Sequence, residues 1–170
     1  SGTVSLLAGS TPGLHYPESR FYIRRIRVSK HSELLEPMKK AGYKIEPAFG
    51  SEDTTMVVEV PVDVGEGIRT AADLSIWEQF SLAAFMQRHW ADNQVSCTVT
   101  FNPETEGEQI APALNYYQYH LKGISLLPRH DYGAYPQMPY EAIDEKEYNK
   151  QVKKLGKLSF GVIKHEEAEV

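Results

Sequence analysis

The sequence predicts an α/β fold with a β-rich insertion at about residues 20–62. From Thr70 onward, helical and strand-like patterns alternate along the chain, which is typical of helices packed on a sheet with parallel neighbours. The earlier part contains β-branched and aromatic runs separated by short polar loops, which is typical of hairpins. With 170 residues, 41% of them hydrophobic, the chain can bury a core, and we interpret residues 1–170 as one domain.

The first half of the chain is expected to begin with a short helix and to continue into strands. Residues 3–8 predict a helix that ends at Gly9, since glycine commonly follows the last helical turn. Residues 21–28 combine β-branched and aromatic side chains in rough alternation and predict a strand. The other elements expected here are a helix at 32–41, ended by Gly42, and two strands at 43–45 and 54–62 that form a hairpin.

The strongest helical pattern of the chain covers residues 70–90. Its apolar residues cover most of the circumference, so we expect this helix to be buried between layers. Residues 95–101 alternate apolar side chains with serine and threonine and predict a strand. The elements expected after it are a helix at 110–121, a strand at 124–127, a loop at 129–140, an exposed helix at 144–155 and a strand at 158–162.

Composition excludes several classes of partner. The net charge of −5 argues against nucleic-acid binding, which depends on neutralising phosphates. No apolar run approaches the ~20 residues of a membrane span, so no membrane partner is expected. One cysteine, Cys97, excludes an internal disulfide and favours a cytoplasmic location.

The chain opens with SGTVS, in which small hydroxyl residues surround a glycine at a predicted helix start. The first turn of a helix leaves backbone N–H groups unpaired, and the helix dipole favours an anion there. Gly2 allows close approach to the backbone, and Ser1, Thr3 and Ser5 add hydroxyls, so this chemistry suits a phosphate. The alternative is an ordinary N-cap in which Ser1 or Thr3 caps the helix.

Three long blocks of the sequence resemble one enzyme family. They are SGTVSLLAGSTPGLHYPESRFYIRRIRV at 1–28, IWEQFSLAAFMQRHWADNQVSCTVTF at 76–101 and LNYYQYHLKGISLLPRHDYGAYPQMPYE at 114–141. These blocks are similar to the adenosylcobalamin-dependent (class II) ribonucleotide reductases of the ribonucleoside-triphosphate type. The resemblance implies that the chain is the C-terminal part of a ten-stranded α/β barrel.

The resemblance also implies a substrate and a site. Ser1, Gly2, Thr3, Val4 and Ser5 match the loop that holds the substrate's phosphates, with hydroxyls from Ser1 and Thr3 and N–H donors from Gly2 to Ser5. The family converts ribonucleoside triphosphates to 2′-deoxyribonucleotides by thiyl-radical chemistry, with adenosylcobalamin as the cofactor. A thioredoxin-like protein is implied as the reductant of the complete enzyme.

The chain lacks the groups that this reaction needs. The family uses at least three cysteines and an Asn-x-Cys-x-Glu motif, whereas Cys97 is the single cysteine here and the motif is missing. We therefore expect no catalytic residue in this chain, no activity of the chain alone, and completion by the N-terminal part of the reductase. The alternative is a non-catalytic interaction segment that only completes the fold of such a partner.

Cys97 and His89 are interpreted as structural, whereas His130, in the 129–140 loop, is freer to contact a ligand. Cys97 shares its strand face with Val99 and is expected to be a small buried thiol rather than a catalytic one. His89 is interpreted as a core or interface residue. No histidine has the spacing from cysteine or glutamate that is typical of zinc, so no metal site is expected. The histidines are His15, His31, His89, His120, His130 and His165.

Two charged or aromatic clusters leave alternatives open. Alternation places Arg25 and Arg27 on one strand face and Arg24 on the other, where they either steer a polyphosphate or pair with glutamates. Three tyrosines of the 129–140 loop either wall a planar cofactor or pack within the loop. These are Tyr132, Tyr135 and Tyr140, whereas Tyr116 and Tyr117 are interpreted as packing residues.

Overall fold

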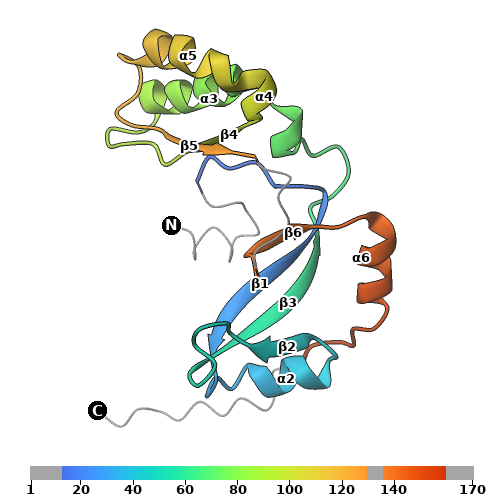
Figure 1. The fold of residues 1–170 in the computed structure, drawn as a ribbon. Coiled ribbons are helices and arrows are strands. Elements are labelled where there is room, and N and C mark those ends of the chain that lie inside the picture. The colour runs from blue at the N-terminus through green and yellow to red at the C-terminus, as the bar shows by residue number, and fades with distance from the viewer. Residues whose placement is uncertain (1–12, 130–135, 160–170) are drawn as a thin grey trace, which may run out of the picture. The chain divides into compact units, whose positions relative to one another are not determined.

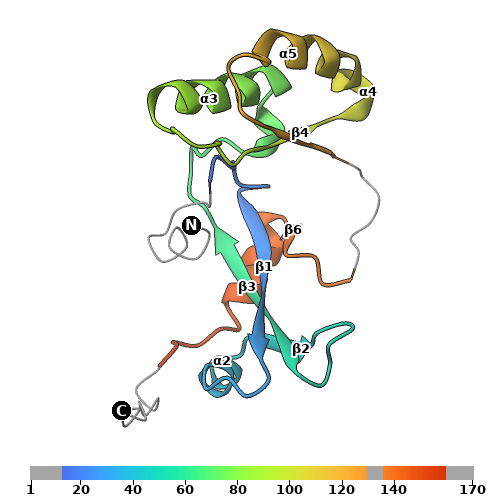
Figure 2. The same cartoon turned by 90° about the vertical axis from the view of Figure 1, so that its left-hand side faces the viewer.

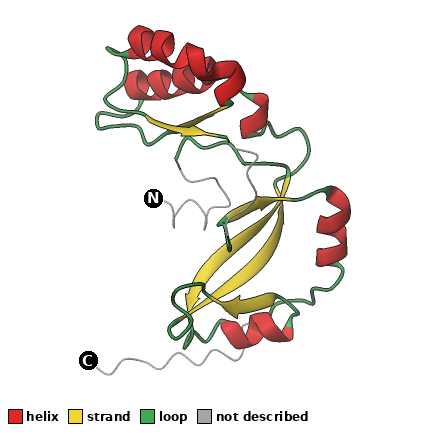
Figure 3. Cartoon of the chain, viewed as in Figure 1, coloured by secondary structure: helices red, strands yellow, loops and turns green. Residues whose placement is uncertain are grey.

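A computed structural model of the chain describes residues 13–129 and 136–159. The chain divides into two compact units (Figure 1). The antiparallel unit comprises Arg20–Gly65 and Ala134–Val170, and the parallel unit comprises Ser1–Ser19 and Glu66–Gly133. Both contain helices and strands, as the predicted α/β class requires (Figure 3). The prediction of one domain stays a prediction.

The antiparallel unit contains a four-stranded sheet in the order β2-β3-β1-β6. The two long strands pair from Phe21↔Asp63 to Ser29↔Thr55, and all three predicted strands of this region are confirmed. The fourth strand lies in and just after the predicted loop 129–140 and was missed, because pairing with β1 rather than local pattern makes it a strand. The strands are β1 (Phe21–Ser29), β2 (Lys44–Pro47), β3 (Thr55–Asp63) and β6 (Tyr140–Ala142).

Two helices belong to this unit, α2 (Leu35–Lys40) and α6 (Glu145–Val152). The Asp144 side chain caps α6 by accepting from the N–H of Glu147 at 2.7 Å. The predicted end of α2 at Gly42 is confirmed: its φ is 87°, and a Cβ there would lie 2.8 Å from a backbone carbonyl oxygen.

In the parallel unit, two helices pack on a two-stranded parallel sheet (Figure 2). The parallel pairing expected from the alternation of elements is confirmed, with Thr98↔Ser125 through Phe101↔Pro128 in register. The main elements are α3 (Ile76–His89), β4 (Thr98–Phe101), α5 (Ile110–Tyr117) and β5 (Ser125–Pro128). The short elements are η1 (Ala71–Asp73), α4 (Pro103–Glu106) and η2 (Gly107–Gln109).

The long predicted helix at 70–90 begins later than expected. Ser75 caps α3 by accepting from the N–H of Glu78 at 3.2 Å, and Glu78 completes a capping box. Thr70 instead opens the 3₁₀ helix η1, and Leu74 is extended. The sequence therefore holds two helix starts five residues apart, of which the second governs the helix.

The core of the parallel unit lies between the helices and β4. Ile76, Phe80 and Val99 are fully buried, and the Phe80 ring stacks on Tyr117 with centroids 5.5 Å apart. The expectation that α3 is buried on most sides is wrong, since Phe85 is 57% exposed in this structure. The helix packs with one face, and the apolar residues on its other face lie at the surface of the described unit.

Two predicted elements fall partly or wholly outside the described residues. The helix at 3–8 lies outside them, and of the strand at 158–162 only Leu158 and Ser159 are described, neither in a strand. Within the described ranges, no helix is long and apolar enough to cross a membrane.

Candidate functional site

The predicted phosphate-binding residues Ser1, Gly2, Thr3, Val4 and Ser5 lie outside the described residues. The same holds for His130, Tyr132, Tyr135 and His165. The other candidate residues lie within the described ranges.

Arg25 is the centre of a charged network on the antiparallel sheet. Its Nε donates to Glu59 Oε1 at 2.9 Å, and its Nη2 donates to Glu141. Glu59 is only 7% exposed and also accepts from Lys44 Nζ at 3.0 Å. Burial opposes the charge of Arg25, but the hydrogen bonds to Glu141 and Glu59 raise its pKa. For Arg25, the expected pairing with glutamates is confirmed, because its guanidinium is hydrogen-bonded to Glu59 and Glu141.

Arg24 and Tyr140 lie on the opposite face of this sheet. The Arg24 guanidinium stands 4.1 Å from the centre of the Tyr140 ring and donates to the Pro139 carbonyl at 3.2 Å. The Tyr140 ring also packs against the Tyr22 ring. Burial raises the pKa of Tyr22, and the neighbouring Tyr140 raises it further. Tyr140 therefore packs against side chains of β1 rather than within its own loop.

The Cys97 thiol is buried in the parallel unit. It is 8% exposed and lies 3.8 Å from the Leu14 carbonyl oxygen. Burial raises the pKa of this thiol, which disfavours the reactive thiolate. The structure supports the interpretation of Cys97 as a packed side chain, because the thiol is buried and no positive group among the described residues lowers its pKa.

We expect Cys97 to be alkylated slowly in the folded chain. The raised pKa lowers the thiolate fraction, and burial slows access of the reagent further. Iodoacetamide labelling at pH 8, followed by mass spectrometry, should therefore be more than ~10-fold slower than in denaturant. Because the unfolded thiol loses its proton at a lower pH, stability should fall as the pH rises above the unfolded pKa. Equal labelling rates would contradict this assignment.

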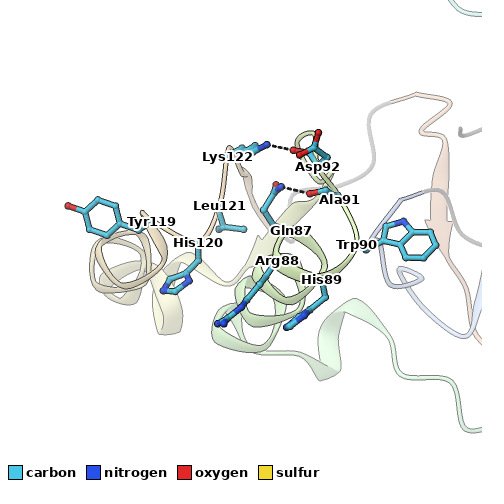
Figure 4. Close-up of a pocket in the computed structure, with 10 residues that line it drawn as sticks. All are labelled: Gln87, Arg88, His89, Trp90, Ala91, Asp92, Tyr119, His120, Leu121 and Lys122. Atoms are coloured by element: carbon cyan, nitrogen blue, oxygen red, sulfur yellow. Dashed lines mark hydrogen bonds between the residues drawn. The ribbon is translucent and has the colours of Figure 1, made fainter.

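One hollow in the parallel unit has a volume of about 540 Å³. It lies between the end of α3 and the segment after α5, and Figure 4 shows Trp90 and Tyr119 pointing to opposite sides. Lys122 Nζ donates a hydrogen bond to the Asp92 carbonyl oxygen. His89 is exposed, and its ring centre lies 4.7 Å from that of Phe85. Of the predicted core or interface role, the core part is therefore wrong, and the interface part stays a prediction. The side chains of this hollow diverge and do not form a convergent binding site.

The carboxyl ends of β4 and β5 carry a polar cluster that no local sequence pattern predicted. Arg129 follows β5 directly; it donates to the Ala71 carbonyl at 2.8 Å and pairs with Glu106 at 3.3 Å. Glu106 also accepts from the N–H groups of Ile76 and Asn102 at 3.1 and 2.9 Å. Ligands of α/β sheets bind at this edge. The sequence signal for this cluster is an arginine immediately after a strand. In the structure, Arg129 bonds to Ala71 and Glu106 and so stabilises this end of the sheet.

The remaining candidates are structural or unassigned. Tyr117 is buried and hydrogen-bonds to Ser81, which confirms its packing role, whereas Tyr116 is exposed. Within residues 13–129 and 136–159 no group of three metal-ligating side chains is found.

Comparison with known proteins gives a consistent result. The chain is 58% identical over 155 residues to the adenosylcobalamin-dependent ribonucleoside-triphosphate reductase of Euglena gracilis, covering 91% of this chain and 21% of that protein. It is 56% identical over 162 residues to the probable enzyme of the same name from Dictyostelium discoideum, covering 94% of this chain and 21% of that protein. The chain thus spans about a fifth of the length of these relatives.

The fold has a counterpart of known structure. A B12-dependent (class II) ribonucleotide reductase matches 92% of this chain with 38% identity and a TM-score of 0.78, and the match covers 22% of that protein. This similarity supports the α/β class, and the described residues by themselves do not form a ten-stranded barrel. No family model matches the chain.

Proposed function

The chain belongs to the family of adenosylcobalamin-dependent ribonucleoside-triphosphate reductases, and we propose that it is a segment of such an enzyme that supplies the substrate's phosphate-binding loop. The observation that carries this proposal is the 58% identity to the Euglena gracilis reductase over 91% of the chain. The complete enzyme would reduce ribonucleoside triphosphates to 2′-deoxyribonucleotides.

The proposed loop consists of Ser1, Gly2, Thr3, Val4 and Ser5. Backbone N–H groups from Gly2 to Ser5 would point at the phosphate oxygens, and Ser1 and Thr3 would donate from their hydroxyls. Charge-assisted hydrogen bonds of this kind are about twice as strong as neutral ones. The loop therefore binds and orients the substrate and does not carry out the chemical step.

The radical chemistry is proposed to take place on other parts of the enzyme. The single cysteine, Cys97, is buried and cannot supply a cysteine pair. The N-terminal part of the reductase would carry the reacting cysteines, with a thioredoxin-like reductant, in the cytoplasm. Adenosylcobalamin would supply the radical chemistry of the complete enzyme. The side chains that line the hollow at the end of α3 do not form a site for it, since Trp90 and Tyr119 point to opposite sides (Figure 4).

A chimeric enzyme tests this proposal. The segment of the Euglena gracilis reductase that matches the chain is replaced by the whole chain. Adenosylcobalamin-dependent reduction of ribonucleoside triphosphates should stay within about tenfold of the parent enzyme, because tenfold corresponds to only about 1.4 kcal/mol. The parent enzyme with the segment deleted is the control. A folded chimera without activity would overturn the proposal.

The buried cysteine also favours the alternative of a non-catalytic interaction segment. The two functions differ in what the chain does to the substrate. Titration of the isolated chain with a ribonucleoside triphosphate, followed by calorimetry, separates them. Binding of the triphosphate but not of the nucleoside supports the phosphate loop. A chimera that keeps its activity when the hydroxyls of Ser1 and Thr3 are removed supports the alternative.

A further inference from the structure

Residues 13–17, here called the anchor segment, are fixed to the parallel unit at two points (dark blue in Figure 1). The Leu14 N–H donates to the Ser96 carbonyl oxygen at 3.4 Å, just before the start of β4. The Ala71 N–H donates to the Pro17 carbonyl oxygen at 2.9 Å. The first bond lies near the start of the segment, and the second lies at its end.

Gly13 is required at the start of the anchor segment. Its φ is 63°, a left-handed conformation that glycine adopts without strain. A Cβ there would lie 3.1 Å from Nδ1 of His15 and 3.2 Å from the Ser96 carbonyl oxygen. Gly50 has a similar φ of 75°, but a Cβ at that position would meet nothing within 4 Å. Gly13 therefore serves the close approach to Ser96 as well as the turn.

Leu14 joins the anchor segment to the hydrophobic core. Its side chain packs against the buried cluster that includes Phe80 and Val99. Its carbonyl oxygen lies 3.8 Å from the sulfur of Cys97, which is 8% exposed. The segment therefore cannot leave the sheet without breaking contacts of the core.

The other end of the anchor segment is connected to the end of β5. Ala71, which bonds to Pro17 through its N–H, accepts from Arg129 through its carbonyl oxygen at 2.8 Å. Arg129 directly follows β5 and pairs with Glu106. The segment is thus held beside the start of β4 at one point and, through Ala71 and Arg129, at the end of β5 at the other.

We propose that the anchor segment positions the phosphate loop, with Gly13 and Leu14 as positioning residues that act through the loop. Only residues 6–12 separate the loop at 1–5 from Gly13, and a short connection restricts where the loop lies. A shift of the anchor segment would move the loop donors away from the phosphate oxygens, and misplacement by about 1 Å costs up to ~100-fold in rate. This inference rests on the proposed function.

A matched pair of leucine variants tests the proposal in the chimeric enzyme. Leu14→Ala and Leu121→Ala each shorten a leucine that packs against the same core, so both should lower the melting temperature. Only Leu14→Ala should raise KM for the triphosphate, by about tenfold, with little change in kcat. Equal KM values in the two variants would overturn the proposal, because they would reduce Leu14 to an ordinary core residue.

A second measurement uses Cys97 as a reporter in the unsubstituted chimera. Movement of the anchor segment away from Cys97 uncovers the thiol, so a ligand that holds the segment in place should slow alkylation by iodoacetamide. Without cofactor and reductant, the triphosphate at about ten times its Kd should slow labelling of Cys97 about tenfold. Binding multiplies the ratio of closed to open segment by one plus the ratio of ligand concentration to Kd. The nucleoside at the same concentration should leave the rate unchanged.

The outcomes of this labelling separate the inference from the proposed function. If the triphosphate binds and Cys97 is labelled at an unchanged rate, the anchor segment is not coupled to the loop. The inference then fails while the proposed function stands. If the chimera binds no triphosphate, both fail. The labelling also decides the matter where Leu14→Ala does not fold.

Discussion

Replacing Arg25 by leucine should destabilise the antiparallel unit by about 3–5 kcal/mol, which is the usual cost of removing one partner from a buried ion pair. Arg25 bonds to Glu59 and Glu141, and it also donates to the Met138 carbonyl at 3.1 Å. Glu59 is 7% exposed, so water cannot replace the guanidinium. Lys44 remains as its partner, but the Lys44 side chain is 60% exposed and supplies a single contact.

Arg27→Leu is the matched control for this prediction. Arg27 lies two residues further along β1, on the same face, and is exposed. Its loss should change stability by less than about 0.5 kcal/mol. Amide exchange of β1 and β3 measures the free energy of opening of this unit. Both tryptophans, Trp77 and Trp90, belong to the parallel unit, so their fluorescence should not change in either variant.

A double variant separates the ion pair from packing. Arg25→Leu together with Glu59→Leu removes both charges, and an apolar replacement of a buried pair is often neutral or stabilising. The double variant should therefore be more stable than Arg25→Leu alone. If Arg25→Leu proved as harmless as Arg27→Leu, the network would contribute nothing to the fold, contrary to the buried contacts described above.

Local sequence patterns predicted those helices and strands whose own residues determine their conformation. The alternating residues of β1 and β3 produced strands where expected, since alternation in a half-buried strand is a property of the strand itself. Of the strand predicted at 95–101, only Thr98–Phe101 forms β4. The three residues of β6 carry no such pattern and become a strand only because β1 offers them an edge. The start of α3 was misplaced because Thr70 and Ser75 are both good helix caps, and only packing chooses between them.

For the candidate site, the sequence predicted which sheet face a residue lies on but not which distant residue it contacts. Alternation placed Arg24 and Arg25 on opposite faces, but no local pattern could pair Arg25 with Glu141, which lies 116 residues away. Likewise, Gln79 reads as one polar residue in an apolar helix, and its bonds to Thr100 depend on how α3 packs on β4. The resemblance of whole blocks, rather than any single residue, carried the assignment to the reductase family.

Removing the two loop hydroxyls should have the largest effect on activity. In the chimeric reductase, Ser1→Ala with Thr3→Val should lower kcat/KM by at least about 100-fold, because each hydrogen bond to a charged group contributes about 1.5–3 kcal/mol. The loss should fall mainly on KM, since the loop holds phosphates that do not react. Ser10→Ala, outside the proposed loop, is the matched control and should leave kcat/KM unchanged.

The same variant also separates a phosphate loop from an ordinary helix cap. Loss of a cap alone costs about 1 kcal/mol of stability and has no reason to depend on the substrate's phosphates. Loss of phosphate contacts should instead weaken binding of the triphosphate much more than binding of the nucleoside, at unchanged thermal stability. A variant that unfolds at a lower temperature but keeps its KM would show that Ser1 and Thr3 only cap the helix. It would leave the chain without its proposed link to the substrate.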